Sequence, residues 1–94
     1  MASNPRIDDL RKRLEKDPGS RLFAQLAEEL RKAGDLDEAV RVARDGLVKH
    51  PAYPSARMTL GRALLDQGGV AAAKIEFEEV LRSAADTILA SRFL

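Results

Sequence analysis

Few side chains in this chain could do chemistry. His50 is the single histidine among 94 residues and there is no cysteine, so neither a histidine-based nor a thiolate-based metal site can be assembled. A Ser-His-Asp arrangement is allowed by composition, yet no serine lies in a strained, glycine-flanked turn. His50 precedes Pro51 at the predicted end of a helix, where an imidazole suits the negative end of the helix dipole. We therefore interpret His50 as structural.

Three other groups of residues could bind charged ligands, and each has a simpler explanation. Glu76, Glu78 and Glu79 are spread around one predicted helix and do not converge on a cation. The basic run 11–13 is flanked by acidic residues without aromatic residues between them, which favours surface salt bridges over RNA or DNA binding. The glycine pair 68–69 lacks a following Lys-Ser/Thr and is interpreted as a turn. We expect no catalysis, cofactor, metal ion or nucleic-acid partner.

The composition favours a small helical protein. Hydrophobic residues make up 45% of the chain, with one Tyr, three Phe and no Trp, so the core must be aliphatic, which suits closely packed helices. Charged residues reach 33% with a formal net charge of +1, and the two signs are mixed along the chain. No apolar run is long enough for a signal peptide or a membrane span. We expect a cytoplasmic protein, or an excised piece of one, without a membrane partner.

The segment 23–51 returns 34 residues later and organises the whole chain. Leucine, glycine and alanine keep their positions in the second copy, and the small Ala27 is matched by the small Gly61. A fixed period of this size signals stacked helical hairpins. The matched positions are Leu26, Leu30, Gly34, Ala39 and Leu47 in the first copy and Leu60, Leu64, Gly68, Ala73 and Leu81 in the second.

The spacing inside each copy resembles the tetratricopeptide repeat, a helix-turn-helix unit of 34 residues. Both copies depart from the family pattern. The first lacks an aromatic residue at Leu30 and has Ala43 where the family prefers Phe, while the second has Arg57 at the usual Trp site and Ala85 in place of proline. The resemblance implies an all-α fold of antiparallel hairpins, stacked as a right-handed solenoid of about six helices. The positions that carry it are Phe23, Leu26, Ala27, Leu30, Ala39, Ala43 and Pro51, followed by Arg57, Leu60, Gly61, Leu64, Ala73 and Phe77.

Local signals place the helix boundaries within a single domain. Asn4 before a proline favours the start of a helix, and Gly34 suits a left-handed helix C-terminus. Asp35 and Glu38 form a variant of the capping box for the next helix, and Asp86 is the expected N-cap of a sixth helix. The domain 1–94 is predicted to contain a capping helix at 5–17, repeat 1 at 20–51, repeat 2 at 54–85 and the truncated first helix of repeat 3 at 86–94.

A surface remains as the candidate for function. In tetratricopeptide arrays the first helices of successive hairpins line a concave groove, so the resemblance implies a protein or peptide partner bound there without catalysis. Helical spacing supports this, because the candidate positions recur every three or four residues opposite the leucine stripe. An exposed Met58 beside Leu65, rimmed by two arginines, suits a peptide with an apolar anchor and an acidic flank. The candidates are Arg21, Ala24, Glu28, Arg31, Ser55, Met58, Arg62 and Leu65, with Leu89 and Arg92 continuing the row.

Two alternatives to a groove stay open. The surface could be only the solvated side of the helices, or the truncated last helix could drive self-assembly into dimers or filaments. One ligand of the family is not expected. Members that bind acidic chaperone tails use a clamp of Lys, Asn and Arg, but the matching positions here are Ala24 and Glu28, and Glu28 would repel a terminal carboxylate. The residues of the assembly surface would be Ile88, Leu89, Phe93 and Leu94.

Overall fold

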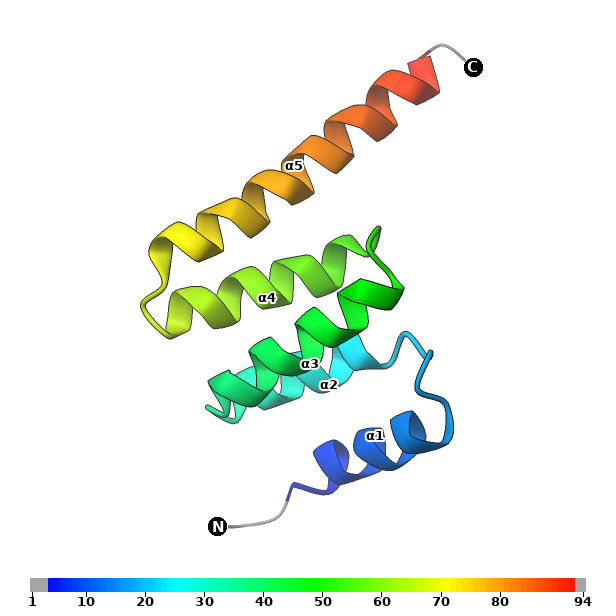
Figure 1. The fold of residues 1–94 in the computed structure, drawn as a ribbon, viewed down its shortest axis with the longest axis vertical. Coiled ribbons are helices and arrows are strands. Elements are labelled where there is room, and N and C mark those ends of the chain that lie inside the picture. Colours follow the sequence, from blue (N-terminus) through cyan, green and yellow to red (C-terminus); the bar gives the residue numbers. More distant parts are fainter. Residues whose placement is uncertain (1–3, 93–94) are drawn as a thin grey trace.

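The computed structural model describes residues 4–92, with side chains described over residues 4–85. Five helices follow one another in this range (Figure 1). The second and third form one hairpin and the fourth and fifth another, while the first packs against the second. The all-α fold of stacked hairpins is thus confirmed. The helices are α1 (Pro5–Lys16), α2 (Phe23–Lys32), α3 (Leu36–Lys49), α4 (Pro54–Asp66) and α5 (Val70–Arg92).

The separate sixth helix expected after Asp86 is not formed. Helix α5 continues without interruption to Arg92, and Figure 1 shows its C-terminal part extending past α4. In the first repeat α3 ends just before Pro51, whereas the second repeat has Ala85 at that position. Because α5 contains neither glycine nor proline, nothing in its sequence breaks the helix.

Glycine closes both hairpin turns in the same way. Gly34 has a φ angle of 86° and Gly68 a φ angle of 87°, a left-handed conformation that costs glycine little. The capping box predicted after the first turn is wrong. Asp35 occupies the N-cap position of α3, but its side chain accepts no capping hydrogen bond, and Glu38 forms an ion pair with Arg41 one turn later instead.

Helix α1 covers one end of the stack. It begins as predicted, because the side chain of Asn4 accepts hydrogen bonds from the backbone amides of Arg6 and Ile7, at 3.1 and 3.2 Å. Ile7 and Leu10 are buried in the common core. The Arg6 guanidinium reaches Glu29 on α2 at 3.0 Å. These apolar and polar contacts attach α1 to α2, consistent with a capping role.

The core is aliphatic and closely packed. Ala27, Ala39, Ala43, Ala56 and Ala63 have no exposed area, and they come from α2, α3 and α4. Side chains this small allow neighbouring helix backbones to approach closely at interior packing density. One buried cluster runs from α1 to α5, so the described helices share a single core.

Each hairpin contains one phenyl ring, but the two rings come from opposite helices. In the first hairpin Phe23 of α2 lies against Gly46 of α3, and a Cβ atom added at Gly46 would overlap the ring. In the second hairpin Phe77 of α5 lies 2.5 Å from where a Cβ of Gly61 would be. A glycine in one helix therefore makes room for a ring from the other. Four positions of the repeat are involved, and they are equivalent in the two hairpins. They hold Phe23, Ala27, Ala43 and Gly46 in the first hairpin, and Arg57, Gly61, Phe77 and Val80 in the second.

Residues at the C-terminal end of α3 form hydrogen bonds with the turn between α1 and α2. Lys49 Nζ donates to the carbonyl of Pro18 at 3.0 Å. The His50 ring donates from Nε2 to the carbonyl of Gly19 at 2.7 Å, and it stacks on Phe23 with ring centroids 5.9 Å apart and 6° between the planes. These contacts support the structural interpretation of His50.

Candidate protein-binding surface

The expected groove residues lie on α2 and α4 and at their N-terminal ends, and these two helices pack side by side. Two of the residues are less accessible than the sequence predicted. Ala24 is only 8% exposed and belongs to the core, and Met58 is half-buried instead of exposed. The cause is that α4 packs against α2 as well as α3, so it covers part of the α2 surface. Leu65 remains an exposed apolar side chain at 47%.

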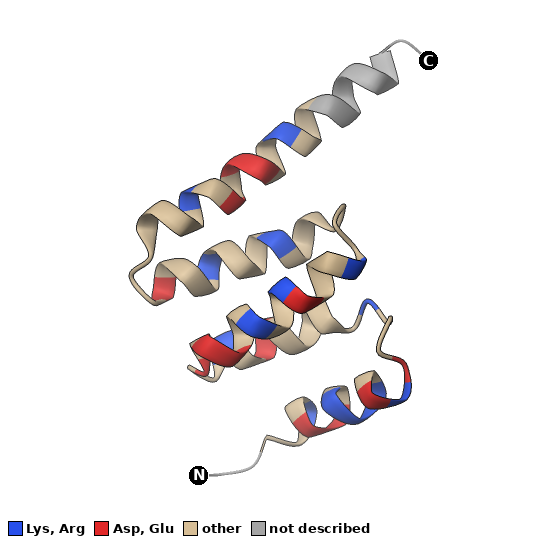
Figure 2. Cartoon of the chain, in the orientation of Figure 1, with Lys and Arg blue, Asp and Glu red and all other residues tan. Residues whose placement is uncertain are grey.

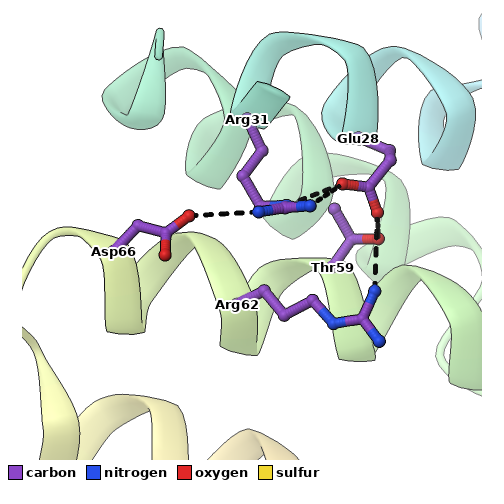
Figure 3. A network of polar contacts seen from close by, with 5 residues as sticks. All are labelled: Glu28, Arg31, Thr59, Arg62 and Asp66. Carbon is purple, nitrogen blue, oxygen red and sulfur yellow. Dashed lines mark hydrogen bonds and ion pairs between the residues drawn. The ribbon is translucent and has the colours of Figure 1, made fainter. Parts of the chain in front are cut away.

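A polar network joins α2 to α4 at the middle of this surface (Figure 3). Arg31 contacts the Oε1 atom of Glu28 at 2.6 Å and Asp66 Oδ2 at 3.2 Å. The Oε2 atom of Glu28 lies 3.8 Å from Arg62 Nη1 and accepts a hydrogen bond from Thr59 at 3.4 Å. Glu28 is thus the central acceptor for groups from both helices. Its negative charge, which we expected to repel an acidic ligand, faces two arginines.

The network holds Arg31 more firmly than Arg62. Both Arg31 and Glu28 are half-buried, and the hydrogen bond with Glu28 raises the pKa of Arg31 above its ordinary value, assisted by Asp66 and opposed by burial. Arg62 is 51% exposed, and its contact with Glu28 is long. Most of the guanidinium donors of Arg62 are therefore free to meet another acceptor.

Thr59 and Asp66 also belong to the network, although they are not among the groove residues predicted from the sequence. Thr59 is buried beneath Glu28, and Asp66 lies at the end of α4. A signal was present, since Thr59 precedes Arg62 by three residues and Asp66 follows it by four, which puts all three on one helix face. Their contact with α2 depends on how the two helices pack, and the helix spacing alone does not specify that.

The N-terminal end of the surface is organised around Tyr53. The guanidinium carbon of Arg21 lies 5.6 Å from the centre of the Tyr53 ring, within the range of a cation–π contact. Tyr53 in turn meets Phe23 edge-on, with ring centroids 5.5 Å apart. Ser55 is exposed in the first turn of α4. Arg21 is thus engaged within the chain, whereas Ser55 is free to face a partner.

Several expected residues lie outside the described side chains. Leu89 and Arg92 were predicted to continue the row on a new helix, but the backbone there is the C-terminal part of α5. Phe93 and Leu94 lie outside the described residues altogether. The assembly surface made of Ile88, Leu89, Phe93 and Leu94 therefore stays a prediction.

Antiparallel hairpins stacked with a period of 34 residues define a helical-repeat protein. A family model described as tetratricopeptide repeat matches residues 30–94. Since this is more than half of the chain, the protein belongs to the tetratricopeptide repeat family. Repeats of this family generally mediate protein–protein interactions and are generally non-catalytic.

The other comparisons add no relative. No curated protein and no solved structure matches the chain. Over the part of the chain that the structure describes, no helix is both long and apolar enough to cross a membrane.

Proposed function

We propose that this protein binds a segment of a partner protein along the surface formed by α2 and α4, without catalysis. The observation that carries the proposal is the unequal engagement of the two arginines in the network. Arg31 is held by two carboxylates, whereas Arg62 has one contact, at 3.8 Å, and is 51% exposed. Arg31 then positions Glu28, and Arg62 contacts the partner.

The partner group that suits Arg62 is a carboxylate. A guanidinium with free donors can bind a carboxylate through two parallel hydrogen bonds, which is stronger and more specific than a single contact. Glu28 lies on one side of Arg62 and restricts its position, so less side-chain entropy is lost on binding. An acidic side chain of the partner would complete the contacts that the network leaves open.

An apolar anchor for the same partner lies one turn away. Leu65 is 47% exposed, and it follows Arg62 by three residues on α4, so both side chains lie on one helix face. The half-buried Met58 precedes Arg62 by four residues on that face, and its flexible thioether can adapt to different apolar groups. The partner motif is therefore an acidic residue flanked by apolar ones.

Selection from a random peptide library tests this proposal. The purified chain should enrich peptides in which Asp or Glu lies near a large apolar residue, and Arg62→Glu should weaken their binding by roughly tenfold or more. The matched control is Arg44→Glu, which reverses an exposed arginine on α3 and should leave binding unchanged. Enrichment of no peptide, or equal binding by the Arg62→Glu variant, would refute the proposal.

A further inference from the structure

Helix α5 is the second helix of its hairpin, as α3 is in the preceding repeat. The outer face of α5 corresponds to the face of α3 that lies against α4. Leu47, on α3, is 7% exposed, whereas its counterpart Leu81 on α5 is 70% exposed. Helix α3 packs against α4, but within the described residues no helix follows α5 to cover the corresponding side (Figure 1). The side chains described on this face of α5 are exposed to solvent.

Apolar side chains dominate this open face, which we call the α5 face. Val70, Ile75 and Leu81 are large apolar residues and all are exposed. Lys74 and Glu78 lie between them in the sequence, exposed and one helical turn apart. Figure 2 shows that α5 carries both basic and acidic positions. Over the described part of the chain neither of these two charges has an ion-pair partner. Exposed large apolar side chains grouped on one helix face make that face a candidate interaction site.

We propose that the α5 face binds the same face of a second copy of the chain, with the two α5 helices antiparallel about a two-fold axis. In such a contact residue i faces residue j of the other copy, and j faces i. If the axis passes midway between Lys74 and Glu78, Lys74 of each copy lies opposite Glu78 of the other. The same register places the bulky Leu81 opposite the small Ala71.

Self-complementary charge favours a second copy over an unrelated partner. The α5 face carries one positive and one negative side chain without an ion-pair partner among the described residues. Antiparallel pairing therefore forms two Lys74–Glu78 ion pairs across the axis. Parallel pairing would instead bring Lys74 against Lys74, and like charges in contact are unfavourable. The bulky Leu81 is also matched with the small Ala71 in the antiparallel register, which lets the two backbones approach closely at that point.

The contact is small, so the dimer is expected to be weak. Stable interfaces bury roughly 1,600 Å² in total, and a single pair of helices buries less. We expect a dissociation constant on the order of 10 to 100 μM. Dimerisation of this kind responds to protein concentration over a range that is accessible in solution.

Sedimentation velocity from about 10 μM to about 1 mM tests for this dimer, since the range spans the expected dissociation constant. The sedimentation coefficient of the parent chain should rise with concentration, and Leu81→Asp should weaken association by roughly tenfold or more. Circular dichroism should show the same helicity for both proteins, because Leu81 is exposed. A strictly monomeric parent chain, or a folded Leu81→Asp variant that associates as the parent does, would overturn the proposal.

Charge reversal tests the antiparallel register. Lys74→Glu alone, or Glu78→Lys alone, places like charges opposite each other and should weaken association by roughly tenfold. The double variant Lys74→Glu, Glu78→Lys restores opposite charges across the axis and should regain association within about threefold of the parent. A double variant that associates as poorly as the single ones would exclude this pairing.

This dimer does not depend on the proposed function, because the α5 face and the α2–α4 surface are different parts of the molecule. Leu81→Asp should keep the peptide binding of the parent chain, and Arg62→Glu should keep its dimerisation. If peptide binding fails while concentration-dependent association persists, only the proposed function is refuted, and the reverse result refutes only the dimer.

Discussion

Glu28 receives contacts from both hairpins at one carboxylate. Arg31 holds it from its own helix, while Thr59 and Arg62 reach it from α4. A half-buried charge with several partners contributes more than an exposed ion pair, whose net value is about 0 to 1 kcal/mol. At the scale of single residues, the network therefore joins α2 to α4 and lies beside Arg62, the arginine proposed to meet a partner.

Removing the charge of Glu28 tests how much the network contributes to stability. Glu28→Gln leaves Asp66 as the one ion-pair partner of Arg31 among the described residues and should lower the free energy of unfolding by about 1 to 2 kcal/mol, measured by urea denaturation. The matched control is Glu29→Gln, because Glu29 pairs with the exposed Arg6 and its loss should cost less than about 0.5 kcal/mol. Equal losses in the two variants would contradict the network's role.

At the scale of the helices, each hairpin packs a phenyl ring of one helix against a glycine of the other. Phe23 and Gly46 in the first hairpin, and Phe77 and Gly61 in the second, place one ring against one glycine with the direction reversed. Two of the departures from the family pattern are explained in this way, since Ala43 accompanies a ring supplied by α2 and Arg57 a ring supplied by α5. Arg57 also pairs with Glu76 of α5 at 2.9 Å, so a polar contact replaces the missing ring there.

Filling the glycine site should destabilise the first hairpin. Alanine favours a helix over glycine by about 1 kcal/mol, but a methyl group at Gly46 would overlap Phe23, and overpacking of this kind costs about 1 to 3 kcal/mol. We expect Gly46→Ala to lower the melting temperature in a calorimetric measurement.

A smaller side chain opposite the new methyl group supplies the control. The double variant Gly46→Ala, Phe23→Leu should be more stable than the sum of the two single effects predicts, because the methyl group then occupies the space vacated by the ring. A melting temperature of Gly46→Ala at or above that of the parent chain would show that Phe23 moves aside without cost.

The molecule as a whole is a row of helices, in which contacts between successive helices are supplemented by packing of α2 against α4. Its extents are 51 × 32 × 17 Å, elongated and thin. Among the described helices, α1 packs its backbone closely against α2 alone. In such an arrangement stability is close to a sum over neighbouring contacts, so the ends should open before the centre.

A substitution at the N-terminal end tests this order. Leu10 is buried, so Leu10→Ala should lower the free energy of unfolding by about 2 to 4 kcal/mol. Hydrogen exchange should speed up first in the amides of α1 and α2, while α4 stays protected. Leu14→Ala is the control, because Leu14 is only half-buried and its loss should cost less. Uniform acceleration in every helix would mean that the domain opens only as one unit.

The sequence alone determined the repeat, the hairpins and the helix surfaces. Leucine and alanine spacing specified which sides of the helices are buried, because helical geometry depends on local order. Glycine at residues 34 and 68 specified the turns, because few other residues tolerate a positive φ angle. These features are local along the chain, which is why the family resemblance and the all-α fold could be predicted.

The tertiary structure decided how these parts meet. Packing of α4 onto α2 buried Ala24, half-covered Met58 and brought Asp66 to Arg31, contacts between residues far apart in sequence. The groove residues could be named from helix spacing, but which of them remain free depends on distances between helices, and no single helix specifies those distances.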